Sequence, residues 1–216
     1  MIIVPTILTS HPQELATTLK RLEPHFDRVQ IDIIDGQFAA NTTISPEVLK
    51  KITTSLKIDF HLMVKHPASW IDRCLPVADR IIAQIEHMPD QQKFLQQVKN
   101  KGARSGLALD LNTPLFRLAP PSLSLAQTLL LMSVPAGFGG QHLNEKIYAK
   151  IRQAKTLRHS ISISCSIYVD GGVNQENIRH LAQAGADEVA VGRHLTQGNI
   201  TANLKTLRQA LVHDSG

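Results

Sequence analysis

The sequence predicts an α/β protein with the (β/α)8 (TIM) barrel architecture, formed by a single domain over residues 1–216. Short β-branched runs alternate eight times with longer amphipathic stretches, a pattern typical of a parallel sheet with right-handed crossovers. The total length is ordinary for one such barrel. The first strand is followed by Thr9-Ser10-His11-Pro12, without the glycines that an open dinucleotide-binding sheet carries at this point. Eight units therefore favour a closed barrel.

The expected strands are the runs richest in Val, Ile and Leu. They cover residues 2–8, 28–34, 57–64, 79–85, 104–109, 127–133, 164–169 and 187–191. Capping signals mark helix starts between them, at Ser10 to Glu14, at Ser45-Pro46-Glu47 and at Asn174 to Glu176. Gly185 is expected to end the helix that Asn174 opens. Residues 203–211 are predicted to form the final helix, which closes the ring.

Composition excludes several classes of protein. Apolar residues make up 43% and charged residues 19%, as in ordinary globular domains. No apolar run approaches the roughly 18 residues of a membrane span, and the first ten residues lack the features of a signal peptide. Cys74 and Cys165 are far apart in sequence, which excludes a zinc ribbon or a disulfide framework. We therefore expect a cytoplasmic protein that does not enter membranes.

The net charge of +5 and a pI of about 9.4 are compatible with nucleic acid, anionic lipid or an anionic metabolite as a partner. Aromatic residues are only 4% and are not interleaved with basic runs, so nucleic acid is not expected. Five basic residues of one helical segment are interpreted as a solvated face: Lys146, Lys150, Arg152, Lys155 and Arg158. A small anionic metabolite remains as the expected partner.

Polar side chains end three of the predicted strands, where barrel enzymes place their active sites. Asp32 shares a strand face with Gln30, His61 shares one with Met63, and Asp170 ends the seventh strand. If these faces point inward, Asp32, His61 and Asp170 converge. Two carboxylates with separated pKa values suit proton abstraction and return, and with a histidine they suit a divalent cation. Taken singly, Asp170-Gly171 is more typical of a turn, and His61 and Met63 are more typical of core packing than of a functional site.

Glycines follow three successive strands, in Pro135 to Gln141, in Gly171-Gly172 and in Gly192-Arg193. Glycine lets backbone N–H groups approach an anion, and barrels often bind phosphate after strands seven and eight. Arg193 adds a guanidinium that can pair with the same phosphate. Three ordinary tight turns are the alternative interpretation.

These residues resemble the ribulose-phosphate 3-epimerase family over nearly the whole chain. The matching stretches are PTIL (5–8), IDIIDGQF (31–38) with Asn41, DFHLM (59–63), LMSVPAGFGGQ (131–141), VDGGVN (169–174) and GADEVAVGR (185–193). They occur in the family's order and spacing. GFGGQ and VDGGVN are specific to the family when they occur together.

The resemblance implies an enzyme of the pentose phosphate pathway that interconverts D-ribulose 5-phosphate and D-xylulose 5-phosphate through an enediolate. Asp32 and Asp170 would be the acid/base pair and, with His61, would bind one divalent ion (Zn²⁺, Fe²⁺, Mn²⁺ or Co²⁺). The resemblance also implies a homo-oligomer. The substrate-binding residues that it implies are Thr6, Met63, Met132, Gly139, Gly140, Gly171, Gly172 and Gly192, and Arg193 is added to them for its charge alone.

This sequence departs from the family around the site. Gln30 replaces the histidine that is the fourth metal ligand, and an amide oxygen is a poorer zinc ligand than imidazole. Ile34 replaces a methionine, Gln84 a histidine and Arg193 a serine, and Pro135-Ala136 replaces Asn-Pro. Three hypotheses stay open: an active epimerase with an altered metal site, an epimerase of another ketose phosphate, and a non-catalytic sugar-phosphate-binding paralogue. The sequence also leaves open the metal, the oligomeric state and closure of the loop at 135–141.

Overall fold

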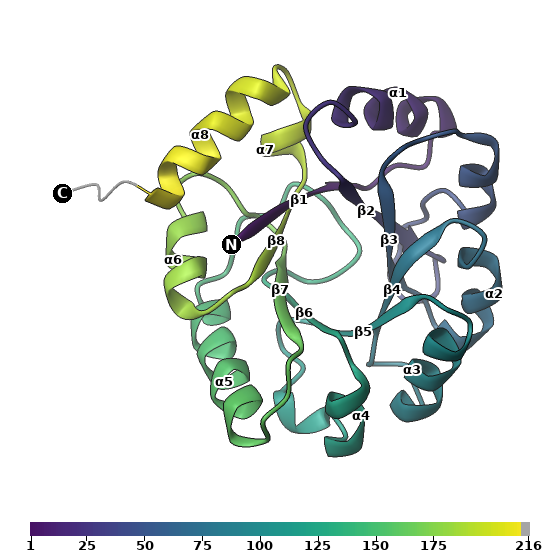
Figure 1. Cartoon of the computed structure of the whole chain (residues 1–216), viewed down its shortest axis with the longest axis vertical. Coiled ribbons are helices and arrows are strands. Elements are labelled where there is room, and N and C mark those ends of the chain that lie inside the picture. Colours follow the sequence, from purple (N-terminus) through teal and green to yellow (C-terminus); the bar gives the residue numbers. More distant parts are fainter. Residues whose placement is uncertain (213–216) are drawn as a thin grey trace.

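The computed structural model describes residues 1–212 and shows a closed barrel of eight parallel strands with helices around the outside (Figure 1). The strands pair in chain order, and β8 pairs with β1 to close the ring. The predicted (β/α)8 fold is therefore confirmed. The end of the predicted domain, at 213–216, lies outside the described residues, so its boundary stays a prediction.

All eight predicted strands are present, with ends within two residues of the expected ones. They are β1 (Ile2–Ile7), β2 (Arg28–Ile34), β3 (Lys57–Met63), β4 (Ala78–Gln84), β5 (Arg104–Leu109), β6 (Thr128–Met132), β7 (Ser166–Asp170) and β8 (Glu188–Val191). The agreement follows from local chemistry, since β-branched and aliphatic residues fill both faces of a buried parallel strand.

The connections are helical and vary more in length and type than the strands, from 3₁₀ turns of three residues to an α-helix of 15 residues. They are α1 (Pro12–Leu22), η1 (Pro46–Lys51), η2 (Pro67–Trp70), α2 (Ile71–Cys74), α3 (Gln91–Asn100), η3 (Leu115–Arg117), α4 (Pro120–Leu125), α5 (Lys146–Ser160), α6 (Ile178–Ala184), α7 (Arg193–Thr196) and α8 (Ile200–Val212), where η denotes a 3₁₀ helix. Within residues 1–212, no helix has both the length and the apolar character needed to cross a membrane.

Three details of the predicted helices need correction. The cap of α1 is His11 rather than Ser10, although Pro12 opens the helix as expected. The Ser45 signal opens a short 3₁₀ helix rather than an α-helix. The last helix begins at Ile200, three residues before its predicted start. The Asn174 signal holds, because its side chain accepts hydrogen bonds from two backbone N–H groups just before α6, and Gly185 ends that helix at a φ of 114°.

The basic face predicted on α5 is only partly solvated. Lys150 is buried, and its ammonium group donates hydrogen bonds to the backbone oxygens of Asp110 and Leu111 after β5. Burial lowers the pKa of Lys150 to about 8. Arg158 forms an ion pair with Asp187. The prediction was wrong for Lys150. The sequence of the helix shows which of its residues are charged, but it does not show that the loop after β5 covers one of them.

Alternation along the strands separates two cores. Outward residues pack beneath the helices in the larger cluster, among them Ile31, Phe60 and Ile81. Inward residues fill the barrel, where Ile82, Leu130 and other apolar side chains form a second cluster. The residues predicted for catalysis occupy inward positions at the carboxyl ends of the strands, so rigid strands hold them in place.

A buried ionic network lies two residues closer to the amino ends of the strands. Arg80 donates hydrogen bonds to Asp59 at 2.6 Å, to both oxygens of Glu188 at 3.0 Å and to Thr128 at 2.9 Å. Arg28 also pairs with Asp59. This network ties β3, β4, β6 and β8 together beneath the site.

Candidate active site at the carboxyl ends of the strands

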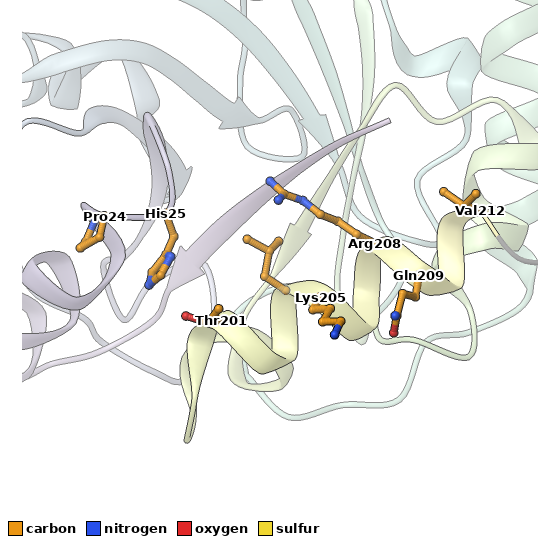
Figure 2. Close-up of a pocket in the computed structure, with 8 residues that line it drawn as sticks. Pro24, His25, Thr201, Lys205, Arg208, Gln209 and Val212 are labelled. Carbon is orange, nitrogen blue, oxygen red and sulfur yellow. The ribbon is translucent and has the colours of Figure 1, made fainter.

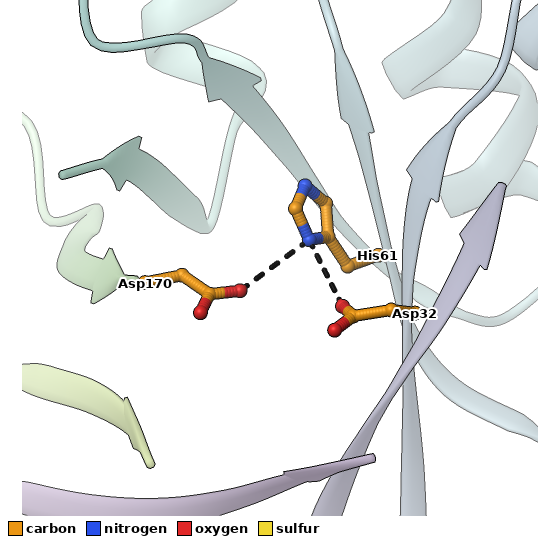
Figure 3. Close-up of side chains that lie close together, drawn as sticks. All are labelled: Asp32, His61 and Asp170. Atoms are coloured by element: carbon orange, nitrogen blue, oxygen red, sulfur yellow. Dashed lines mark hydrogen bonds and ion pairs between the residues drawn. The ribbon is translucent and has the colours of Figure 1, made fainter. Parts of the chain in front are cut away.

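Asp32, His61 and Asp170 point toward one another from β2, β3 and β7 (Figure 3). Asp32 lies opposite His61 in the strand register. The Nδ1 atom of His61 is 3.1 Å from Asp32 Oδ1 and 3.5 Å from Asp170 Oδ2. One ligand atom from each residue lies within 4.8 Å of the other two, and all three residues are buried. The predicted convergence is confirmed, and the group is able to bind a metal ion.

Gln30 faces the same two carboxylates. Its Nε2 atom lies 2.9 Å from Asp32 Oδ1 and 2.6 Å from Asp170 Oδ2, the oxygens that His61 also approaches. Nε2 is also 3.1 Å from the hydroxyl of Thr6, which itself donates to Asp32 Oδ2 at 3.2 Å. The structure thus joins Thr6 and Gln30, both predicted from the sequence, to the acidic pair.

Gln84 lies on the other side of the imidazole, with its Nε2 atom 3.1 Å from His61 Nε2. The sequence identifies Gln84 only as a departure from the family, and its contact with the histidine emerges from the fold. A metal-bound histidine usually donates its second ring N–H to a carbonyl or carboxylate. Gln84 carries such an oxygen, Oε1, which is buried and has no hydrogen-bond partner among the described residues.

Electrostatics at the centre favour positive charge. Burial disfavours the charged form of His61, yet hydrogen bonds to Asp170 and Asp32 outweigh burial and raise its pKa to about 9. Burial also raises the pKa of Asp32, and the nearby charge of Asp170 adds to this, while hydrogen bonds from His61 and Gln30 oppose it. A cation between the two carboxylates would relieve their repulsion. The donor set of two carboxylates, one imidazole and nearby amides therefore fits a divalent ion.

Apolar side chains enclose the charged group. Met63 and Met132 are buried in the inner cluster together with Ile34, and Met132 lies opposite Asp170 in the register of β6 and β7. Val134 and Ala136 extend this cluster into the loop after β6. Such surroundings lower the local dielectric and strengthen electrostatic interactions with a reacting group.

The glycine-rich loops meet at this end of the barrel, as predicted. A Cβ atom added at Gly140 would lie 2.5 Å from the guanidinium of Arg193, and Gly140 has a left-handed φ of 78°. At Gly172, an added Cβ would collide with the backbone around His142. At Gly192, an added Cβ would lie 3.5 Å from the methyl group of Thr6, an ordinary van der Waals contact. Glycine is therefore required at Gly140 and Gly172, in the loops after β6 and β7.

The loop at 135–141 is also held from the opposite side. Asn41, in the loop after β2, donates a hydrogen bond to the backbone oxygen of Gly137 at 2.8 Å, and Ala39 lies directly against Gly137. Gln141 donates to the oxygens of Pro135 and Phe138 at 2.9 Å. The loop thus bridges the loops after β2 and β8, an arrangement that sequence reasoning missed because it depends on contacts between distant segments.

A separate hollow of about 610 Å³ lies on the outside of the barrel, between the end of α1 and α8 (Figure 2). Its walls include Pro24, His25, Leu204 and Arg208. None of the residues that line it belongs to the loops described above, so it is distinct from the candidate active site.

Comparisons with known proteins agree with this geometry. The sequence profile of the ribulose-phosphate 3 epimerase family matches residues 2–196. Ribulose-phosphate 3-epimerase from Aquifex aeolicus is 37% identical over 169 residues, which cover 77% of this chain and 76% of the relative. The enzyme of the same name from Helicobacter pylori is 31% identical over 221 residues, covering 98% and 100%.

Solved structures show the same fold at greater distance. A mutant tryptophan synthase alpha-subunit from Pyrococcus furiosus superposes with a TM-score of 0.69 and 16% identity, covering 98% of this chain and 97% of that one. This likeness concerns the barrel alone. The matched family profile, the similar relatives and the convergent acidic site together show that the chain belongs to the ribulose-phosphate 3-epimerase family.

Proposed function

We propose that this chain interconverts D-ribulose 5-phosphate and D-xylulose 5-phosphate, with Asp32 and Asp170 as its two acid/base groups. The observation that carries this proposal is the pair of carboxylates, which come from non-adjacent strands and converge on one point beside His61. Two carboxylates on opposite faces of a substrate carbon can remove a proton from one face and return one to the other, which inverts that carbon.

The reaction needs one carboxyl group charged and the other protonated. The base removes the C3 proton, and the electrons of the C–H bond move into the C2–C3 bond and onto the C2 oxygen of an enediolate. The other carboxylic acid then gives its proton to C3 on the opposite face. The raised pKa of Asp32, which results from burial and from the charge of Asp170, supports a pair in which one member holds a proton.

We further propose that one divalent ion (Zn²⁺, Fe²⁺, Mn²⁺ or Co²⁺) is held by Asp32, His61 and Asp170. Such an ion would supply positive charge that stabilises the enediolate. The proximity of the three ligands and the paired negative charges of Asp32 and Asp170 support binding of a cation, for which His61 would give up its ring proton. Met63 and Met132 contribute apolar surfaces that exclude water from the reacting carbon.

The phosphate of the substrate is assigned to the loops after β6, β7 and β8. Backbone N–H groups at the glycines would bind its oxygens, with Arg193 supplying a charged contact from the start of α7. Thr6 would contact the substrate through the hydroxyl that now bonds Asp32. The assigned glycines are Gly139, Gly140, Gly171, Gly172 and Gly192.

We also infer a cytoplasmic homo-oligomer. Cys74 and Cys165 are free and buried, which suits a reducing compartment. The oligomer follows from the family resemblance, and light scattering on the purified protein would measure it.

The decisive experiment measures formation of D-xylulose 5-phosphate by protein stripped of metal and then refilled with each of the four ions. We expect activity to return with at least one ion. Absence of turnover under every condition would overturn the proposal. Turnover of a hexulose 6-phosphate instead would indicate another ketose phosphate, and tight phosphosugar binding without proton exchange at C3 would indicate a binding protein.

A further inference from the structure

The terminal amide of Gln30 occupies the fourth position around a common centre. Its Nε2 atom and His61 Nδ1 approach the same two oxygens, Asp32 Oδ1 and Asp170 Oδ2. The side chain of Gln30 is fully buried, and the neighbouring strands fix its position. The four terminal groups therefore face one another from β2, β3 and β7 (the three residues of Figure 3 and Gln30).

The oxygen of the same amide has no use in this arrangement. Gln30 Oε1 is buried without a hydrogen-bond partner among the described residues, whereas Nε2 lies close to three acceptors. Ionised carboxylates only accept hydrogen bonds, so they attract the N–H side of an amide. Rotating the terminal amide by half a turn exchanges nitrogen and oxygen at almost the same positions, so the oxygen can face the centre without movement of the backbone.

We propose that Gln30 binds the metal through Oε1 and thereby reduces the preference of the site for Zn²⁺ over Mn²⁺. This inference rests on the metal site of the function proposed above. The ligands are then three oxygens and one nitrogen, from Asp32, Asp170, Gln30 and His61. Carboxylate and carbonyl oxygens suit Mn²⁺, whereas imidazole suits Zn²⁺. A site with one imidazole and three oxygen ligands therefore favours Zn²⁺ over Mn²⁺ by less than a site with two imidazoles would.

The test measures metal binding without turnover. Dissociation constants are determined on the full chain stripped of metal, for Mn²⁺ by electron paramagnetic resonance of the free ion and for Zn²⁺ by competition with a chelator. The variants are Gln30→His and Gln30→Leu. Gln153→His is the matched control, because it makes the same substitution on the exposed side of α5. It measures how much metal affinity an added histidine brings when it lies outside the site.

Gln30→His should raise affinity for Zn²⁺ at least ~10-fold more than affinity for Mn²⁺, whereas Gln153→His should change neither. Gln30→Leu, which has neither amide atom, should weaken Mn²⁺ binding by ~10-fold or more. An unchanged Zn²⁺-to-Mn²⁺ ratio in Gln30→His would overturn the inference. So would unchanged Mn²⁺ affinity in a folded Gln30→Leu protein. If Gln30→Leu fails to fold, as circular dichroism would reveal, the ratio in Gln30→His decides.

Failure of the two proposals can be told apart. A protein that binds Mn²⁺ through Gln30 but does not epimerise ribulose 5-phosphate refutes the proposed function alone. A protein that epimerises this substrate but shows no effect of Gln30 on the metal ratio refutes the inference alone.

Discussion

Replacing Asp170 with asparagine tests the two-carboxylate mechanism most directly. Asparagine keeps the size of the side chain but cannot accept a proton from C3. The local geometry should survive, since asparagine retains an oxygen that can accept the hydrogen bond from Gln30. His61 also keeps its shorter contact, which is the one to Asp32 at 3.1 Å rather than the one to Asp170 at 3.5 Å.

The expected loss follows from what one acid/base group contributes. A positioned acid or base accelerates proton transfer by about 10²–10⁴-fold, which corresponds to about 2.7–5.4 kcal/mol of activation free energy. Inversion requires both groups, so kcat for Asp170→Asn should fall by at least about 10²-fold. Asp170 precedes the phosphate-binding glycines but does not belong to them, so affinity for a phosphate-bearing substrate analogue should change by less than about 1 kcal/mol, or roughly fivefold.

Proton exchange in D₂O separates this role from a structural one. At saturating metal, the remaining Asp32 can still remove and return a proton on its own face. We therefore expect Asp170→Asn to incorporate deuterium at C3 of one epimer without inversion, and to leave the other epimer unlabelled. Asp32→Asn should show the opposite selectivity. Nuclear magnetic resonance of the recovered sugars measures both.

Two results would refute this reasoning. One is an Asp170→Asn protein that retains a tenth or more of the wild-type turnover. The other is a parallel loss of deuterium incorporation from both epimers at saturating metal, which would mean that Asp170 serves the metal or the structure rather than acting as the second base.

Three further substitutions probe other parts of the molecule. Arg193→Ser should raise KM for the phosphosugar while kcat changes little, because one charge-assisted contact worth about 1.5–3 kcal/mol is lost; steady-state kinetics with unchanged KM would contradict this. Arg80→Met leaves the buried carboxylate of Glu188 without its ion-pair partner, while Asp59 keeps Arg28. The change should cost about 3–5 kcal/mol of unfolding free energy in urea titrations, whereas a neutral effect would show that the network adds no stability. Arg73 lowers the pKa of Glu47 to about 2, chiefly through a hydrogen bond. This half-exposed pair should therefore stabilise the fold above the ordinary pKa of glutamate and lose that contribution as pH falls toward 2. Glu47→Gln should cost about 0.2–1 kcal/mol at pH 7 and much less near pH 2, where Glu47 is half protonated in the folded protein. Equal thermal shifts at both pH values would argue against the ion pair.

The sequence by itself determined the strands and the candidate residues on them. Strand positions follow from local composition, which places Asp32, His61 and Asp170 near the carboxyl ends of their strands. Alternation shows which residues share a face, and the barrel decides which face points inward. The glycines after the last three strands were also visible in the sequence. They indicated where the backbone of one loop can approach another closely, because glycine has no Cβ atom.

Only the tertiary structure decided which of these side chains touch. Gln30 and Asp170 are 140 residues apart in sequence, and their contact depends on closure of the barrel. The contacts of Gln84 with His61, of Arg193 with Gly140 and of Lys150 with the loop after β5 also join separate strand–helix units. Periodicity determines the face on which a side chain lies, whereas strand register and loop packing determine its partner, so the bridge that Gln30 forms between two carboxylates was visible only in the folded chain.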